Sequence, residues 1–192
     1  SIFIMSDIRV YDNFVSEEEF LPIHQYFVDT RTGFNGESVP WYWVDGVNKF
    51  GDGRFMFVNL CYGNLQIVNH TMFQVLVPIL MKIDPLSLTR IKANLTVRDD
   101  TPVDDSHYHT DDNYCNCVED GGEGEDATMT TAIYYVNTNN GGTQFKNGEQ
   151  VNSVANRLVV FPCHMYHAPI GHTDEKNRIV INFNYFHSQT GI

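Results

Sequence analysis

Basic residues are few in this chain. Its 192 residues include 12 Lys and Arg against 24 Asp and Glu, which gives a formal net charge of −12 at pH 7. Because proteins bind nucleic acids largely through clustered Lys and Arg, this charge disfavours a nucleic-acid partner. A basic protein segment or a small molecule is easier to accommodate, although such a charge also serves simply to keep a protein soluble.

Long apolar runs are absent as well. No stretch of the sequence approaches the ~20 consecutive apolar residues that a membrane-spanning helix needs. Nor is there a basic segment followed by the long apolar stretch and small-residue cleavage site of a signal peptide. We therefore expect no membrane partner and an intracellular, cytoplasmic location.

Cysteine is scarce, and its spacing excludes the commonest zinc sites. The four cysteines are Cys61, Cys115, Cys117 and Cys163. The C-x-C spacing of the middle pair differs from the C-x2-C and C-x4-C spacings of zinc knuckles. Without a secretory signal, we expect free thiols in a reducing compartment; a disulfide from Cys115 or Cys117 to another loop is the alternative.

What the sequence does contain predicts one compact domain over residues 1–192. Hydrophobic residues make up 42% and aromatic residues 13%, enough for a sizeable core. The opening "SIFIM" indicates an edge strand, and "IRVYDNFVSEEEFLPIHQYF" indicates a strand and then a helix, in which Ser16 and Glu19 form a capping box. A second helix is expected in "NHTMFQVLVPILMKI", where Pro78 kinks it or lies near a boundary.

Strand patterns dominate the rest of the chain. Two β-rich runs, "VPWYWV" and "RFMFVNLCY", lie between the helices. Five more occupy the chain from about Leu88 onward: "SLTRIKANLTVR", "ATMTTAIYYVN", "GGTQF", "NRLVVF" and "NRIVINFNYF". Successive β-branched and aromatic runs divided by Gly, Asn and Asp are typical of an antiparallel sandwich or barrel. We expect an α+β, mainly β fold, with supporting elements in residues 1–87, a barrel core in 88–192 and the helices packed outside a sheet.

A candidate metal site occurs in "SHYHTDDNY". Its His107, His109 and Asp111 stand at alternate positions, which point to one face of an extended chain. A further ligand is available in "FPCHMYHAP", as His164 or His167. Two imidazoles and one carboxylate form the facial triad of non-haem Fe(II) oxygenases. His-x-His with a later carboxylate and His also describes cupin-type sites, so a metal-binding barrel without redox chemistry is an alternative.

Arg178 is the second unusual feature, because it stands in the apolar strand pattern "RIVINFNYF". Burying an Arg among apolar residues is costly unless it has an anionic partner. A guanidinium pointing into the barrel can bind a carboxylate through two hydrogen bonds. The alternative is an Arg at the start of the strand that pairs with the nearby Asp174 or Glu175.

These segments together resemble the Fe(II)- and 2-oxoglutarate-dependent oxygenases, and among them the prolyl-hydroxylase-like branch. "HTD" is similar to the family's His-x-Asp motif, and "TAIYYVN" followed by "GGTQF" is similar to its Ile-Tyr-Tyr-Leu-Asn strand and Gly-Gly turn. "NRLVVFPCHMYH" resembles the strand and loop that bring the distal His, and "RIVINFNYF" resembles the last core strand. The opening "YDNFVSEEEF" also resembles the entry of these proteins. The motifs follow the family's order, and the resemblance covers nearly the whole chain.

The resemblance implies a double-stranded β-helix (jelly-roll, cupin-like) core and assigns the metal ligands. His109, Asp111 and His167 would bind Fe(II). His164 falls in a variable part of the loop and would not be a ligand. For His107 we expect a bend in the backbone, or a place behind the ligands or at the mouth of the site.

The resemblance also implies residues for the cosubstrate and the substrate. Arg178 would bind the distal carboxylate of 2-oxoglutarate, with the hydroxyl of Tyr135 donating to the same group and Asn94 as a further polar contact. Asn182 and Asn184 alternate with Arg178 and would face the substrate pocket, to which His107 would also contribute. Prolyl hydroxylases tend to have an indole at the position of Asn184, so this pocket would be more polar.

The implied activity is hydroxylation of a C–H bond, with Fe(II) as the metal and with 2-oxoglutarate and O2 as cosubstrates. 2-Oxoglutarate would be decarboxylated to succinate and CO2. A prolyl or other residue in a protein or peptide is the first substrate hypothesis, and a small molecule such as a free amino acid is the alternative. The acidic segment "VEDGGEGED", residues 118–126, would gate the site, attract a basic peptide or simply be solvated.

Overall fold

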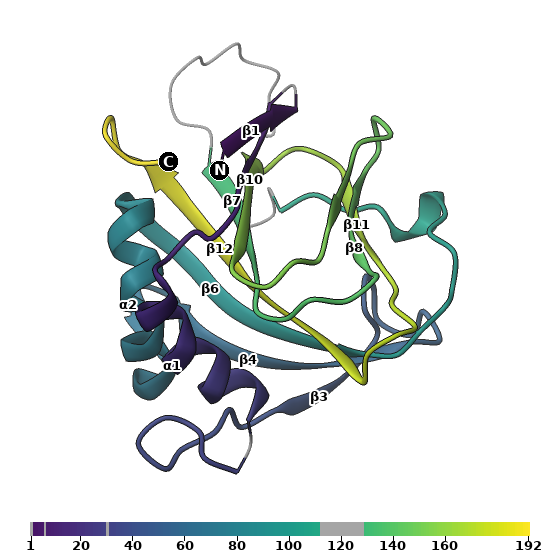
Figure 1. Cartoon of the computed structure of the whole chain (residues 1–192). Helices are drawn as coiled ribbons and strands as arrows, with labels where there is room; N and C mark the ends of the chain where they lie inside the picture. Colours follow the sequence, from purple (N-terminus) through teal and green to yellow (C-terminus); the bar gives the residue numbers. More distant parts are fainter. Residues whose placement is uncertain (1, 6, 30, 112–128) are drawn as a thin grey trace.

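The structure is a computed structural model that describes residues 2–5, 7–29, 31–111 and 129–192 (Figure 1). The acidic segment 118–126 and the cysteines Cys115 and Cys117 lie outside the described residues, so the expectations on them stay predictions. In the described part of the chain, no helix is long and apolar enough to cross a membrane.

A large antiparallel sheet forms the body of the fold. Its strands lie in the order β1-β2-β10-β7-β12-β6-β4-β3, and β5 pairs with β4. The strands are β1 Ile2–Met5, β2 Ile8–Tyr11, β3 Tyr42–Asp45, β4 Phe55–Gly63, β5 Gln66–Ile67, β6 Pro85–Val97, β7 Met129–Tyr135, β10 Arg157–Pro162 and β12 Asn177–His187. The predicted edge strand at the N-terminus is confirmed as β1.

A second, smaller sheet contains β8 Gly142–Phe145, β9 Gln150–Asn152 and β11 His167–Ile170, in the order β11-β8-β9. The pattern analysis did not predict β5, β9 or β11, which are only two to four residues long. The smaller sheet faces the large one, as Figure 1 shows for β8 and β11. The predicted mainly β, jelly-roll-like core is therefore confirmed.

Two helices cover the outer face of the large sheet. α1, Glu17–Val28, begins with the predicted capping box between Ser16 and Glu19. α2, His70–Ile83, is capped by the side chain of Asn69, which accepts from the backbone N–H of Met72. Pro78 lies inside α2 and not at its boundary. Figure 1 shows both helices on the same side of the sheet, as predicted.

Alternation along the strands separates two hydrophobic clusters. On β12, Ile179, Ile181, Phe183 and Tyr185 pack with the helices in the larger cluster. Val180, on the opposite face of the same strand, belongs to a smaller cluster between the two sheets. Successive side chains of a strand point to opposite faces, so the even-numbered polar residues of β12 are directed to the interior between the sheets.

Candidate metal centre and its cavity

Three side chains meet between the two sheets: His109, Asp111 and His167. One ligand atom of each lies within 4.8 Å of the others. Backbone hydrogen bonds fix two of them, because the N–H of His109 donates to the carbonyl of His167 at 3.0 Å and the N–H of His167 donates to the carbonyl of His109 at 2.9 Å. The N–H of Asp111 donates to the carbonyl of Cys163 at 2.9 Å. The main chain thus brings together residues that lie far apart in sequence.

The imidazole of His167 is oriented for ligation. Its Nδ1 lies 3.0 Å from the carbonyl oxygen of Met165, which can only accept, so Nδ1 carries the hydrogen. The lone pair is therefore on Nε2, which is buried without a partner among the described residues. Burial, followed by repulsion from His109, lowers the pKa of His167 to about 4, so the ring is neutral at pH 7. A neutral ring with one nitrogen fixed by a carbonyl is the state that a metal requires.

Neighbouring side chains fix the orientation of the Asp111 carboxylate. Its Oδ2 accepts hydrogen bonds from Thr131 Oγ1 at 2.9 Å and Asn184 Nδ2 at 3.0 Å, and its Oδ1 lies 3.7 Å from Arg90 Nη2. Burial raises the pKa of Asp111. In the acid range where Asp111 titrates, His167 is protonated too, and its charge, the charge of Arg90 and the hydrogen bond from Asn184 outweigh burial and lower the pKa of Asp111. Asp111 is therefore ionised at neutral pH.

A metal fits these three residues. Besides Nε2 of His167, Nδ1 of His109 is buried without a partner in the described part of the chain. Buried imidazole nitrogens without partners are costly, and a cation between them and an ionised carboxylate would satisfy all three. Two imidazoles and one carboxylate suit Fe(II).

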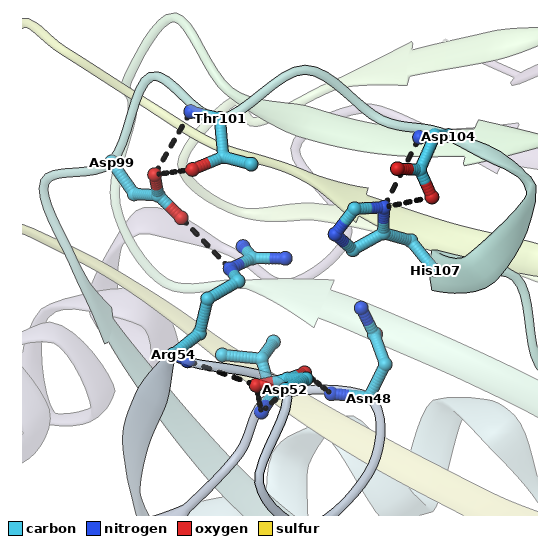
Figure 2. Close-up of polar contacts among 8 residues, drawn as sticks. Asn48, Asp52, Arg54, Asp99, Thr101, Asp104 and His107 are labelled. Atoms are coloured by element: carbon cyan, nitrogen blue, oxygen red, sulfur yellow. Dashed lines mark hydrogen bonds and ion pairs between the residues drawn. The ribbon is translucent and has the colours of Figure 1, made fainter.

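The other two candidate histidines are not part of this cluster. His107 ends the short 3-10 helix η1, Asp105–His107, so the backbone bends where we expected it to. Its Nδ1 lies 3.1 Å from the backbone N of Asp104 and 2.9 Å from its carboxylate, as Figure 2 shows. His164 is exposed. Alternation in an ideal strand would have placed His107 beside His109, and the 3-10 turn prevents this.

A cavity of about 300 Å³ opens beside the cluster. Arg178, Asn94 and Asn182 line it together with the three clustered residues. Arg178 is only 4% exposed, and one Nη donates to the carbonyl of Gly142 at 2.8 Å. Its Nε is buried without a partner among the described residues. Neither Asp174 nor Glu175 forms an ion pair with it there, so the guanidinium is directed to the cavity and not to the start of the strand.

Tyr135 and Asn184 lie behind the cavity wall. The ring of Tyr135 packs against the guanidinium of Arg178 at 5.7 Å, and its hydroxyl donates to Thr143 Oγ1 at 2.7 Å. Thr143 lines the cavity, whereas Tyr135 and Asn184 do not. Asn184 is fully buried and contacts Asp111, Thr131 and Arg90. The structure thus places Asn184 behind the carboxylate and not in the substrate pocket.

Pattern reasoning missed several cavity residues. Arg90, Lys92 and Asn94 stand at alternate positions of β6 and line the cavity together. The alternation in "TRIKANLTV" is the signal that could have revealed Arg90 and Lys92. Asn48 also lines the cavity, from the loop between β3 and β4, and no strand pattern could have placed a loop residue there.

The carboxylate of Asp52 shapes that loop. It accepts hydrogen bonds from the backbone N–H groups of Val47, Asn48 and Arg54 at 3.0–3.3 Å. Arg54 pairs with Asp99 at 2.8 Å, which ties the loop to the segment leading to the metal cluster. Figure 2 shows the side chain of Asn48 pointing away from Asp52. Both atoms of its amide are buried without partners in the described residues.

No family model matches the chain, and no curated protein matches its sequence. Among solved structures, a prolyl hydroxylase from Trichoplax adhaerens, in complex with a peptide of hypoxia-inducible factor, is similar with a TM-score of 0.56 at 13% identity, over 95% of this chain and 84% of that one. SnoN, an α-ketoglutarate-dependent epimerase of nogalamycin biosynthesis, gives 0.56 at 12% identity, over 93% and 77%. SnoK, a carbocyclase of the same biosynthesis, gives 0.55 at 13% identity, over 94% and 79%. The chain therefore has the fold of the Fe(II)- and 2-oxoglutarate-dependent oxygenases.

Proposed function

We propose that the protein is an Fe(II)- and 2-oxoglutarate-dependent dioxygenase that hydroxylates a C–H bond. The observation that carries this proposal is a single cavity that joins His109, Asp111 and His167 to the buried cation of Arg178. Bound Fe(II) would activate O2 and couple the decarboxylation of 2-oxoglutarate, to succinate and CO2, to oxidation of the substrate. The fold shared with enzymes of this kind supports the proposal.

The chain's own residues would perform three tasks. His109, Asp111 and His167 would hold the metal through one face and leave its other positions for 2-oxoglutarate and O2. Arg178 would bind the distal carboxylate of 2-oxoglutarate, which gives its buried guanidinium an anionic partner. Tyr135 would act through its contacts with Arg178 and Thr143, and Asn94 would donate to the cosubstrate from β6.

For the substrate, a prolyl or other residue of a protein and a small molecule such as a free amino acid are the two candidate classes. The fold occurs in a peptide-bound prolyl hydroxylase and in small-molecule enzymes alike. The polar lining formed by Asn48, Asn94 and Asn182 favours a polar target over the apolar ring of a prolyl residue.

A metal-binding barrel without redox chemistry is the other candidate. Such a protein needs no buried guanidinium beside the metal, whereas a 2-oxo acid with a second carboxylate does. The position of Arg178 on the cavity wall therefore favours the oxygenase.

The test is an anaerobic titration with Fe(II) and then 2-oxoglutarate. We expect the weak visible charge-transfer absorption of a 2-oxo acid bound to Fe(II), and succinate formation once air is admitted. His109→Ala, Asp111→Ala and His167→Ala should each abolish both signals, whereas His164→Ala, at an exposed residue of the same loop, should keep them. Full activity of the His167 variant together with loss in the His164 variant would contradict the assignment.

A further inference from the structure

The cavity wall carries more positive charge than 2-oxoglutarate requires. Arg90, Lys92 and Arg178 line it, and Asp111 is the one carboxylate among the described lining residues. The described residues of the wall thus have an excess of two positive charges, in a chain whose net charge is −12. In the proposed function, the charge of Fe(II) and that of the 2-oxoglutarate dianion cancel, so the excess remains. Unbalanced charge in a partly closed cavity is costly, and an anion would offset it.

The register of β6 against β12 fixes the order of the three cations along the cavity wall. On β6, Lys92 pairs with Asn182 of β12. Arg90, two residues before Lys92 and on the same face of β6, pairs with Asn184. Arg178 lies opposite Thr96, at the other end of the same face of β6. The pair Arg90–Lys92 is therefore near the metal cluster, and Arg178 is the cation at the distal end.

The two cations of β6 differ in their surroundings. Arg90 donates from Nε to Asn184 Oδ1 at 2.8 Å and lies 3.7 Å from Asp111. Lys92 forms no hydrogen bond or ion pair with any residue that the structure describes. Burial, followed by repulsion from Arg90, lowers the pKa of Lys92 to about 8. Attraction to the Asp111 carboxylate raises this pKa but only partly offsets the other two effects, so an anion from outside the chain would stabilise the ammonium group.

We propose that Lys92, beside Arg90, binds a carboxylate of the molecule that is oxidised. The inference rests on the proposed function and deepens it: the substrate is a small carboxylic acid, with a free amino acid as the best fit. The buried carbonyl oxygens of Asn48 and Asn182, which have no partners in the described residues, would accept hydrogen bonds from an amino group of the same molecule. A cavity of about 300 Å³, shared with 2-oxoglutarate, leaves room for a molecule of this size.

The carboxylate at Lys92 has two possible sources, because 2-oxoglutarate itself carries a second carboxylate. Mn(II) in place of Fe(II) allows them to be separated, since Mn(II) accepts the same kinds of ligand and its unpaired electrons relax the protons of molecules bound nearby. The probe is acetate, the smallest carboxylate with a methyl proton signal. Its relaxation is measured with the Mn(II)-loaded protein, without 2-oxoglutarate and with a saturating amount of it.

We expect saturable relaxation of acetate that persists in saturating 2-oxoglutarate, with acetamide giving none. Lys92→Met should weaken the binding of acetate at least tenfold. The affinities for Mn(II) and 2-oxoglutarate, measured by calorimetry, should stay within about twofold of those of the wild type. Lys92→Arg should restore most of the binding. Lys146→Met, which removes an exposed lysine that does not line the cavity, is the matched control for the loss of one positive charge.

Three kinds of result would overturn the proposal. Displacement of acetate by 2-oxoglutarate, or loss of 2-oxoglutarate affinity in Lys92→Met, would assign Lys92 to the cosubstrate. Binding of acetamide as tight as that of acetate, or no saturable relaxation of acetate with the wild type, would show that the cavity has no anion site. Turnover of peptides that lack acidic residues, with none of free amino acids, would reject the small-acid substrate. Failure of the proposed function itself would appear earlier, as no calorimetric binding of Mn(II) or 2-oxoglutarate.

Discussion

Asn184 bridges the candidate metal ligand Asp111 and the cavity cation Arg90: its Nδ2 lies 3.0 Å from Asp111 Oδ2, and its Oδ1 accepts from Arg90 Nε at 2.8 Å. A fully buried amide thus fixes the direction of the carboxylate and keeps the guanidinium from approaching it further.

Asn184→Leu should therefore weaken metal binding. The substitution keeps the approximate size of the side chain but removes one of the two hydrogen bonds that orient Asp111 Oδ2, and loss of such supporting contacts typically costs 10–100-fold in metal affinity. Calorimetric titration with Mn(II) measures the change. Asn182→Leu, on the same face of β12 without a contact to Asp111, is the control and should leave the metal affinity within about twofold. Equal effects of the two changes would refute the bridging role.

Arg178→Ala should abolish tight binding of 2-oxoglutarate and leave metal affinity nearly unchanged. Removing one partner of a buried ion pair costs roughly 3–5 kcal/mol, which corresponds to a loss of more than about 100-fold. Arg98→Ala is the control, because Arg98 is exposed and donates to the backbone carbonyl of Glu175. The affinity for 2-oxoglutarate is measured by calorimetry with the Mn(II)-loaded protein. An affinity of Arg178→Ala within twofold of the wild type would show that Arg178 does not bind 2-oxoglutarate.

Lys92→Met should stabilise the ligand-free protein. A Lys whose pKa is lowered to about 8 in the folded state destabilises that state at pH 7, by about 1–3 kcal/mol once its partial exposure is discounted. A gain of this size raises Tm by about 2–12 °C in a chain of this length. Thermal unfolding of both proteins at pH 7 measures it.

The same thermal measurement has a pH dependence with a defined sign. Below pH 8, Lys92 is protonated in the folded and the unfolded state, so the full cost applies. Between pH 8 and the ordinary lysine value of 10.5, the unfolded state binds more protons, so the cost falls as pH rises. The advantage of Lys92→Met should therefore shrink over this range; an advantage that is constant with pH would contradict the assignment to Lys92.

Asp52→Ala should loosen the loop that carries Asn48 to the cavity. The change leaves the N–H groups of Val47, Asn48 and Arg54 without their acceptor, at a cost of about 1–3 kcal/mol. Hydrogen exchange of these amides should accelerate. Asp100→Ala, the loss of an exposed carboxylate in the neighbouring segment, is the control.

Asp52 also predicts an effect of acid. Burial raises its pKa, but the backbone hydrogen bonds from Asn48, Arg54 and Val47 outweigh burial and lower it below the ordinary 3.8. The stability that Asp52 contributes is therefore present above pH 3.8 and is lost as pH falls through its folded-state pKa. Protection of the loop amides should decrease over this acidic range in the wild type and not in Asp52→Ala.

The sequence by itself predicted the helices, most of the strands and a candidate set of site residues. Local signals sufficed for this: the capping box at Ser16, the alternating runs of β6, β7, β10 and β12, and an Arg in an apolar strand. Such signals depend on backbone periodicity and capping within a few residues, so they can be read without knowledge of distant contacts. The roles given to His109, Asp111, His167 and Arg178 remain predictions, and the structure shows that these side chains meet on one cavity.

Only the tertiary structure decided which side chains meet. The 3-10 turn at Asp105–His107 removes His107 from the face that its spacing suggested. Strand register places Asn184 behind Asp111, 73 residues away in sequence, and Lys92 opposite Asn182. The physical reason is that a strand's pattern fixes which face a residue occupies, whereas its neighbours across the sheet depend on pairing with distant strands. The excess of positive charge among the described cavity residues follows from that pairing.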